Sequence, residues 1–403
     1  MAQPGDYYLG ESEIAALFEG RVKDFVFSDV APQSTPVLSL FGAQQGAGKS
    51  QAILARRQEA DGQNLIPLSP DDLRPLHPRY EEVLATHPLL MKDATAQATT
   101  VWMAMCHTYA QRHGYGLILE GTFKDPKALL ATAEAYASRG YRVELTALAV
   151  RQELSRLSTL DRYLPAFDAA PGRWVYPDRH DHAYRTIPGA VTAAEAASQV
   201  HKFRVTNRAG DDLFTNVRDA DGAWVRDPAA AAAIEAERAR PFAPAEAQQW
   251  MRLSHRAALN YGAGGHIDDT TYGALRKMLQ DAHTVGPMAS WTSDDIAQHT
   301  AIEQVVAGLS NPSPWTERQS RDFVQSRSEL VQAHNETWRD QLERIDALAQ
   351  PLLHPDVVAQ RALMDLRVRS FPHDAQRTTS EPQRSPGAVH HRAEQDRGRG
   401  IEH

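Results

Sequence analysis

Residues 43–50 read Ala-Gln-Gln-Gly-Ala-Gly-Lys-Ser, which is the spacing of a phosphate-binding loop with alanine at the first glycine position. Glycines let backbone N–H groups turn toward phosphates without a Cβ clash. The ammonium group of Lys49 is expected to reach the β- and γ-phosphates of a nucleotide, and the hydroxyl of Ser50 to bind Mg²⁺. The predicted site for ATP and Mg²⁺ is therefore the whole loop: Ala43, Gln44, Gln45, Gly46, Ala47, Gly48, Lys49 and Ser50.

Two further stretches carry acidic side chains directly after short apolar runs. Asp71 and Asp72 follow residues 65–68, and Glu120 ends the run 116–120, with Thr122 close behind. A carboxylate at Asp71 could orient and deprotonate a substrate hydroxyl, whereas Asp72 more simply caps a helix. Glu120 and Thr122 are candidates for contact with the substrate or with hydrated Mg²⁺.

Positive charge for a transferred phosphoryl group could come from arginine, whose planar fork matches phosphate oxygens. Arg162 lies on a charged segment at 151–164, and Arg173 lies in the loop beyond it. A phosphate loop, an acceptor-side acid and two arginines are the parts that phosphoryl transfer requires. Lys49 and Asp71 are therefore candidate catalytic residues, while Arg162 and Arg173 are candidates among many arginines, most of which are expected to be solvated.

These residues need a framework that brings strand ends together. Buried-strand patterns occupy residues 35–42, 65–68, 116–120 and 141–150, and helical patterns separate them at 48–60, 96–113 and 126–139. Such alternation predicts an α/β fold of the P-loop NTPase type, with a parallel sheet flanked by helices. In such a sheet the carboxyl ends of the strands face the ligand crevice, where the candidate residues lie.

The rest of the chain changes in character. Residues 202–216 look like two strands around a bend at Gly210, and residues 243–370 are mostly helical. We expect four parts, which are a helical segment at 1–35, a kinase core at 36–225, a helical region at 226–370 and a disordered tail at 371–403. The helical region could dock a partner protein, carry a delivery signal, act as a lid or simply pack on the core.

Bulk properties exclude several classes of protein. The 403 residues carry a formal charge of -8, which argues against a nucleic-acid binder. A single cysteine, Cys106, excludes an internal disulfide, and we expect it to be buried. The chain has neither an apolar leader nor an apolar run of membrane-spanning length, so the expected location is the cytoplasm, either of the producing cell or of a target cell into which the chain is delivered.

Five blocks in this order resemble the zeta toxins, the kinase toxins of bacterial toxin–antitoxin systems. They are Ala43–Ser50, Asp71–Pro78, Glu120–Thr122, Asp161–Tyr163, and Arg173 with His180-Asp181 beyond it. The resemblance covers about residues 10–220. It implies an ATP- and Mg²⁺-dependent kinase that phosphorylates the 3′-hydroxyl of the amino sugar of UDP-N-acetylglucosamine, with a protein antitoxin as a possible partner.

The same resemblance implies roles for single residues. Asp71 matches the general base, Glu120 and Thr122 match residues of the substrate pocket, and Arg162 and Arg173 match the arginines that neutralise the transferred phosphate. His77 and His180 are expected to hold loops in place and not to do chemistry.

Two departures from the family keep alternatives open. The stretch 101–106 lacks the acidic substrate contact expected before the third strand, so the acceptor could be another nucleotide such as NAD. About 160 residues follow the family's kinase core, and a chain ending near Arg240 is expected to stay active. A polynucleotide kinase or a non-catalytic ATP-dependent binding module are further alternatives, although the module would not need Asp71.

Overall fold

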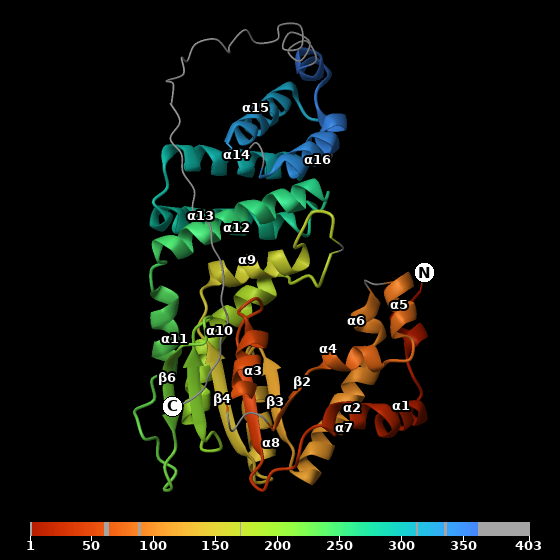
Figure 1. Ribbon diagram of the computed structural model, residues 1–403, viewed down its shortest axis with the longest axis vertical. Coiled ribbons are helices and arrows are strands. Elements are labelled where there is room, and N and C mark those ends of the chain that lie inside the picture. The colour runs from red at the N-terminus through yellow and green to blue at the C-terminus, as the bar shows by residue number, and fades with distance from the viewer. Residues whose placement is uncertain are drawn as a thin grey trace, which may run out of the picture. The chain divides into compact units, whose positions relative to one another are not determined.

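A computed structural model describes residues 2–59, 64–87, 90–169, 171–311, 313–333 and 337–361. The chain divides into two compact units, Met1–Leu353 and His354–His403. The first unit contains the sheet and the helices named below (Figure 1). The predicted disordered tail at 371–403 lies outside the described residues.

Six strands form one sheet in the order β2-β3-β1-β4-β5-β6. Their bounds are β1 Val37–Gly42, β2 Leu65–Leu68, β3 Gly116–Gly121, β4 Arg142–Leu148, β5 Lys202–Thr206 and β6 Asp212–Val217. The first five strands pair in parallel, and only β6 runs antiparallel, against β5. The predicted mostly parallel sheet is confirmed, and the phosphate-binding loop leaves its centre at the end of β1.

Both faces of the sheet are covered, which explains why its strands are apolar almost throughout. Along β1, Leu38 and Leu40 point into the larger hydrophobic cluster, while Val37 and Phe41 point into a smaller one under α3. The larger cluster contains side chains from α7, α8, α10 and α11, among them the buried Cys106, as predicted.

The helices around the sheet have these bounds: α1 Glu11–Leu17, α2 Lys23–Phe27, α3 Lys49–Gln58, α4 Pro70–Leu73, α5 Tyr80–Thr86, α6 Met91–Ala94, α7 Ala96–His113, α8 Pro126–Ala137, α9 Gln152–Tyr163, α10 Pro177–Ala196 and α11 Ala230–Ala239. Five more follow: α12 Pro244–Ala263, α13 Tyr272–Val285, α14 Ser293–Leu309, α15 Glu317–Ala333 and α16 Arg339–Ala349. The predicted helices at both ends are present, while the exact domain boundaries stay a prediction.

Helix α10 was not predicted, and it contains a proline at Pro188. A proline has no N–H to donate to the carbonyl four residues earlier, which here belongs to Tyr184. That carbonyl oxygen instead accepts a hydrogen bond from Nη1 of Arg238 at 2.9 Å, and the Arg238 guanidinium lies over the Tyr184 ring. Helix α10 therefore continues through Pro188 because a residue of α11 replaces the missing donor.

The C-terminal helices pack on the sheet-containing part of the chain through α9. The indole N–H of Trp250 on α12 donates to the carbonyl of Glu153 at 3.0 Å, and the hydroxyl of Tyr261 donates to the carbonyl of Leu160 at 3.0 Å. Trp250 and Tyr261 are both fully buried. Among the described residues, none of the helices is both long and apolar enough to cross a membrane.

Candidate active site

The phosphate-binding loop connects β1 to α3, as predicted. Gly46 and Gly48 have φ angles of 76° and 95°, in the left-handed region that side chains disfavour. A Cβ on Gly46 would also lie 2.1 Å from the carbonyl oxygen of Ser155. The loop therefore depends on glycine at position 46 for its conformation and for its close contact with α9.

One predicted ligand of the nucleotide, Gln44, points its side chain into the protein. It is fully buried, and its Nε2 donates to the carbonyl of Val150 at 2.8 Å and to Oγ of Ser155 at 3.2 Å. Nη2 of Arg238 donates to Gln44 Oε1 at 3.4 Å. The Gln44 side chain therefore holds the loop in place, and only its backbone is free to face a phosphate.

Lys49 begins α3 and lies at the centre of the candidate site. Its Nζ donates to the carbonyls of Ala43 at 3.0 Å and Gln44 at 3.3 Å. Burial lowers the pKa of Lys49 to about 8; the nearby charge of Glu120 opposes this shift, and those of Arg162 and Arg173 add to it. Glu120, Arg162 and Arg173, which are all predicted site residues, therefore lie close enough to Lys49 to change its pKa.

Asp71 lies on α4, directly beyond the end of β2. Its Oδ2 accepts a hydrogen bond from Nη1 of Arg173 at 3.0 Å, and its Oδ1 accepts one from Nε of Arg74 at 2.9 Å. Asp71 and Arg173 are both more than half exposed, so a ligand can reach the pair. The cap of α4 is Ser69, whose Oγ accepts a hydrogen bond from the N–H of Asp72 and donates one to the Asp72 carboxylate.

Arg162 and Arg173 reach the site from the two ends of a short loop. Arg162 is exposed in the last turn of α9, and Arg173 follows Gly172, whose N–H donates to the carbonyl of Tyr163 at 2.6 Å. A Cβ on Gly172 would lie 2.7 Å from the carbonyl oxygen of Arg162. This close approach brings the two predicted arginines together.

Glu120 and Thr122 flank the position where β3 meets the phosphate-binding loop. Gly121 is in register with Gly42, and its carbonyl accepts a hydrogen bond from the N–H of Ala43 at 3.3 Å. Glu120 is exposed and Thr122 is half-buried. Both predicted substrate contacts therefore lie beside the first residue of the loop.

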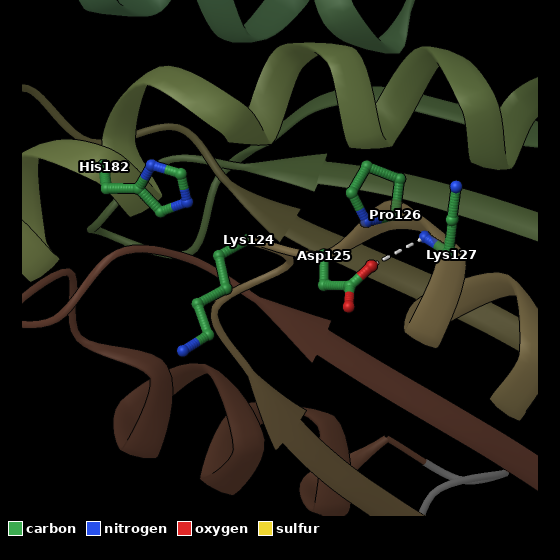
Figure 2. A pocket seen from close by; sticks show the side chains of 5 residues that line it. All are labelled: Lys124, Asp125, Pro126, Lys127 and His182. Atoms are coloured by element: carbon green, nitrogen blue, oxygen red, sulfur yellow. Dashed lines mark hydrogen bonds between the residues drawn. The ribbon is translucent and has the colours of Figure 1, made fainter.

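Beyond β3 the chain borders a pocket of about 530 Å³ (Figure 2). Its lining residues are Lys124, Asp125, Pro126, Lys127 and His182. The Asp125 carboxylate is occupied as the cap of α8, because it accepts hydrogen bonds from the N–H groups of Lys127 and Ala128. The two lysines are exposed and leave the pocket with positive charge.

One arginine at the site was missed from the sequence. Arg208 lies in the turn between β5 and β6, and its Nη1 donates to the Gly46 carbonyl at 3.2 Å and to Ser158 Oγ at 2.8 Å. Burial lowers the pKa of Arg208. The sequence offered one signal for this arginine, which is its position directly after a strand parallel to β4. A residue in that position lies at the same edge of the sheet as the phosphate-binding loop.

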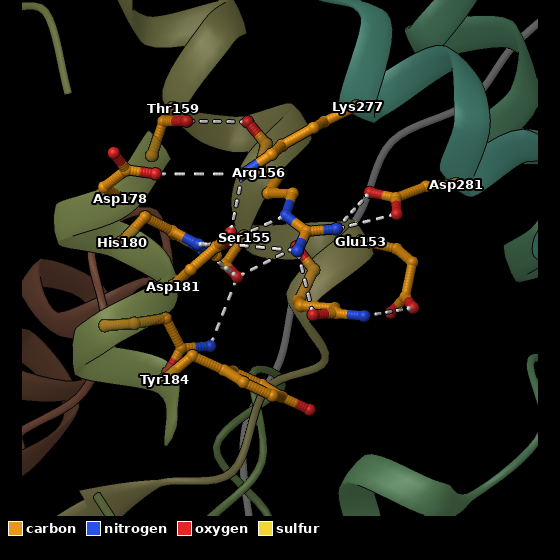
Figure 3. A network of polar contacts seen from close by, with 12 residues as sticks. Glu153, Ser155, Arg156, Thr159, Asp178, His180, Asp181, Tyr184, Lys277 and Asp281 are labelled. Atoms are coloured by element: carbon orange, nitrogen blue, oxygen red, sulfur yellow. Dashed lines mark hydrogen bonds and ion pairs between the residues drawn. The ribbon is translucent and has the colours of Figure 1, made fainter. Parts of the chain in front are cut away.

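A second missed feature is a chain of polar contacts behind the loop (Figure 3). Ser155 Oγ is 2.8 Å from His180 Nε2, and His180 Nδ1 is 2.9 Å from Asp181 Oδ1. Burial lowers the pKa of His180, so the ring is neutral near pH 7. His180 makes hydrogen bonds, as predicted. It holds Ser155, whose carbonyl oxygen lies against Gly46.

The same chain continues into the C-terminal helices. Arg156 on α9 bonds Asp181 at 3.2 Å and, through Nη1, both oxygens of Asp281 on α13 at 2.7 and 3.0 Å. Lys277, also on α13, lies 3.0 Å from Asp181. Burial alone would lower the pKa of Arg156, but the two carboxylates outweigh it and raise that pKa. Helix α13 is therefore connected through α9 and α10 to the phosphate-binding loop.

Comparison with known proteins agrees with this geometry. Residues 23–219 match the Zeta toxin family. The chain is 28% identical to toxin zeta of Enterococcus hirae over 210 residues, which cover 50% of this chain and 72% of the relative. It is 31% identical to toxin PezT of Streptococcus pneumoniae over 128 residues, which cover 32% and 50%.

The fold is also similar to a solved structure from the PezAT chromosomal toxin–antitoxin system of Streptococcus pneumoniae. The TM-score is 0.50 at 19% identity, over 69% of this chain and 100% of the other. The matched residues 23–219 include the phosphate-binding loop, Asp71, Glu120 and both site arginines. Residues 23–219 therefore form a domain of the zeta toxin family.

Proposed function

We propose that this protein is an ATP-dependent kinase that phosphorylates the 3′-hydroxyl of the amino sugar of UDP-N-acetylglucosamine and acts as a toxin. The observation that carries the proposal is the position of Arg173. It binds Asp71 at 3.0 Å and is also close enough to Lys49 to lower its pKa. The proposed acceptor-side carboxylate and the phosphate-side lysine therefore have one arginine near both of them, which supports transfer of a phosphoryl group between them.

The loop fits the phosphates of ATP. Residues 43–48 turn through two left-handed glycines, and among the described residues the ammonium of Lys49 donates to the carbonyl oxygens of Ala43 and Gln44 alone. Phosphate oxygens are stronger partners because they are charged. Lys49 would hold the β- and γ-phosphates, and backbone N–H groups of the loop would complete the cradle.

The site also offers oxygen donors that suit Mg²⁺. The hydroxyl of Ser50 is exposed at the start of α3, and the carboxylate of Glu120 lies near Lys49. Hard cations such as Mg²⁺ prefer oxygen ligands. Bound Mg²⁺ would neutralise phosphate charge, and Ser50 would be its protein ligand.

Asp71 would serve as the general base. As the acceptor hydroxyl oxygen forms its bond to the γ-phosphorus and the bond to the ADP oxygen breaks, the hydroxyl proton would pass to a carboxylate oxygen of Asp71. Arg162 and Arg173 would neutralise the three oxygens of the moving phosphoryl group. Arg173 forms an ion pair with Asp71, and acceptor binding would exchange this pair for contacts with the substrate.

The acceptor is proposed to be a nucleotide sugar because of the family and because of the charge of the nearby pocket. Lys124 and Lys127 line the pocket beyond β3, where they would favour an anionic ligand such as a diphosphate. The absence of an acid in residues 101–106 favours a different nucleotide acceptor, such as NAD, as the second candidate. As a zeta toxin, the chain is further proposed to bind a protein antitoxin.

The test is a product assay with matched variants. Purified protein would be incubated with Mg·ATP and UDP-N-acetylglucosamine, NAD or nucleosides, and products identified by mass spectrometry. Asp71→Asn should lose about 10²–10⁴-fold in turnover and keep ATP binding. Asp72→Asn, which changes an exposed neighbour whose carboxylate accepts a hydrogen bond from the helix-capping Ser69, should keep its activity.

Each alternative result has a definite meaning. A phosphorylated product from NAD alone would keep the kinase and replace the acceptor. ATP binding without any phosphorylated product, together with an unaffected Asp71→Asn variant, would refute the kinase and favour a binding module.

A further inference from the structure

We propose that the C-terminal helices contain a transition-metal site, best suited to Zn²⁺, made by His283, His299 and Glu303. The site lies outside the proposed kinase centre and does not depend on its chemistry. His283 is in the last turn of α13, while His299 and Glu303 are on α14. A shared ion would therefore join the two helices.

The distances fit a common ion. Nε2 of His283 is 3.5 Å from Oε1 of Glu303, and Nε2 of His299 is 3.6 Å from the same oxygen. One possible ligand atom from each of the three residues falls within 4.8 Å of the other two. Two ligands that each lie about 2.1 Å from a tetrahedral Zn²⁺ are separated by about 3.4 Å, so only small side-chain movements are needed.

The backbone already presents two of the ligands on one face. His299 and Glu303 are four residues apart on α14, a spacing that places side chains one turn apart on the same side of a helix. The third ligand comes from a different helix, so the ion would restrain tertiary structure.

His299 is prepared to bind a metal. It is 1% exposed, and among the described residues its Nε2 has no hydrogen-bond partner, although an unpaired buried nitrogen is costly. A ring nitrogen that is buried without a partner and lies beside a carboxylate is well placed to bind a cation.

The other nitrogen of His299 is held by a neighbour. Its Nδ1 lies 3.1 Å from Nε2 of His255, a buried residue of α12. A partner at one ring nitrogen fixes the tautomer and the orientation of a metal-binding histidine. His255 would therefore direct Nε2 of His299 toward the ion.

The ligand set selects the kind of ion. Two imidazoles and one carboxylate suit Zn²⁺ and related metals, whereas Ca²⁺ and Mg²⁺ prefer oxygen ligands alone. His283 is 63% exposed and Glu303 is 33% exposed, so water can complete the coordination. The proposed role of the ion is structural. Helix α13 also carries Lys277 and Asp281, whose ammonium and carboxylate, respectively, bind the network behind the phosphate-binding loop.

The test uses the full chain, purified without a histidine tag and freed of metal with a chelator. We expect Zn²⁺ to raise the melting temperature by several degrees at about 100 times its dissociation constant. Co²⁺ in its place should give the visible absorption of a site with nitrogen ligands. Both signals should be lost in His283→Asn and Glu303→Gln, two changes at accessible side chains that leave the buried His299 in place.

Matched controls separate this site from other histidines. His113→Asn changes an exposed histidine in the last turn of α7 and should keep the full Zn²⁺ response. The histidines at 373, 390, 391 and 403 are present in every variant, so Zn²⁺ bound there is a constant background. The proposal is overturned if Zn²⁺ leaves the melting temperature unchanged, or if His283→Asn and Glu303→Gln respond to it as wild type does.

Discussion

The charge of Lys49 should make ATP binding depend on pH within an accessible range. Burial lowers its pKa from an ordinary 10.5 to about 8 in the free protein. That shift corresponds to about 3 kcal/mol of unfavourable free energy for holding the charged ammonium at this buried position. Phosphates remove this cost because they supply negative charge, so bound ATP should raise the pKa again.

The magnitude follows from the fraction of protein in which Lys49 carries its proton. With a pKa of about 8, this fraction falls from about three quarters at pH 7.5 to about one tenth at pH 9. If ATP requires the charged form, its affinity should fall about eightfold over this interval. At pH 9, binding should also take up nearly one proton per ATP.

The stability of the free protein should change in the opposite direction. A lysine with a lowered folded-state pKa binds fewer protons in the folded than in the unfolded state between about pH 8 and 10.5. The cost of burying the charged ammonium is therefore absent above pH 10.5, where Lys49 is neutral in both states. As the pH falls from 10.5 to 8 this cost grows, and the folded protein becomes less stable. The difference in melting temperature between wild type and Lys49→Met should show this trend while cancelling other titrating groups.

The assay is isothermal titration of ATP at pH 7.5, 8.2 and 9 in buffers of different ionisation enthalpy. Lys49→Met should bind ATP weakly, with little change across this range. Lys23→Met, which removes a partly buried lysine of α2 that is paired with Glu19, should follow wild type. Equal ATP affinity of wild type at pH 7.5 and 9, or an equal decline in Lys49→Met, would refute the reasoning.

Three further changes test the surroundings of the loop. Arg208→Ala removes the donor to the Gly46 carbonyl and should raise the KM for ATP about tenfold with little change in kcat, as steady-state kinetics would show. Asp281→Asn weakens the ion pair with Arg156 and should lower the melting temperature by about 3–6 °C, measured by calorimetry. A chain ending at Arg240 should be poorly soluble and inactive, because it exposes the surface of α9 that α12 covers; a soluble, fully active product would contradict this expectation.

Much of the kinase core could be predicted because its signals are local. The apolar run before Ala43 and the glycines after it define strand and loop without any long-range information. Asp71 and Glu120 were placed at one sheet edge because each follows a strand, and parallel strands end at the same edge. The charges of Glu120, Arg162 and Arg173 do act on Lys49, which agrees with that placement.

The supporting contacts could not be predicted because their partners are distant in sequence. Ser155 meets His180 across 25 residues, and Arg156 meets Asp281 across 125. Single serine, histidine or aspartate residues have no periodicity that would mark them. Helix α10 was missed for a related reason, since Pro188 discourages a helix and the compensating donor, Arg238, lies 54 residues from the carbonyl it binds.

These contacts change the expected role of the C-terminal helices. Helix α9 touches the phosphate-binding loop at Ser155, presents Arg162 at its end, and is held from the other side by α12 and α13. A displacement of α9 would therefore move a loop contact and an arginine of the proposed site together. The sequence favoured a self-sufficient core ending near residue 240, whereas the geometry gives the later helices a positioning function, because they fix the helix that joins both halves of the proposed site.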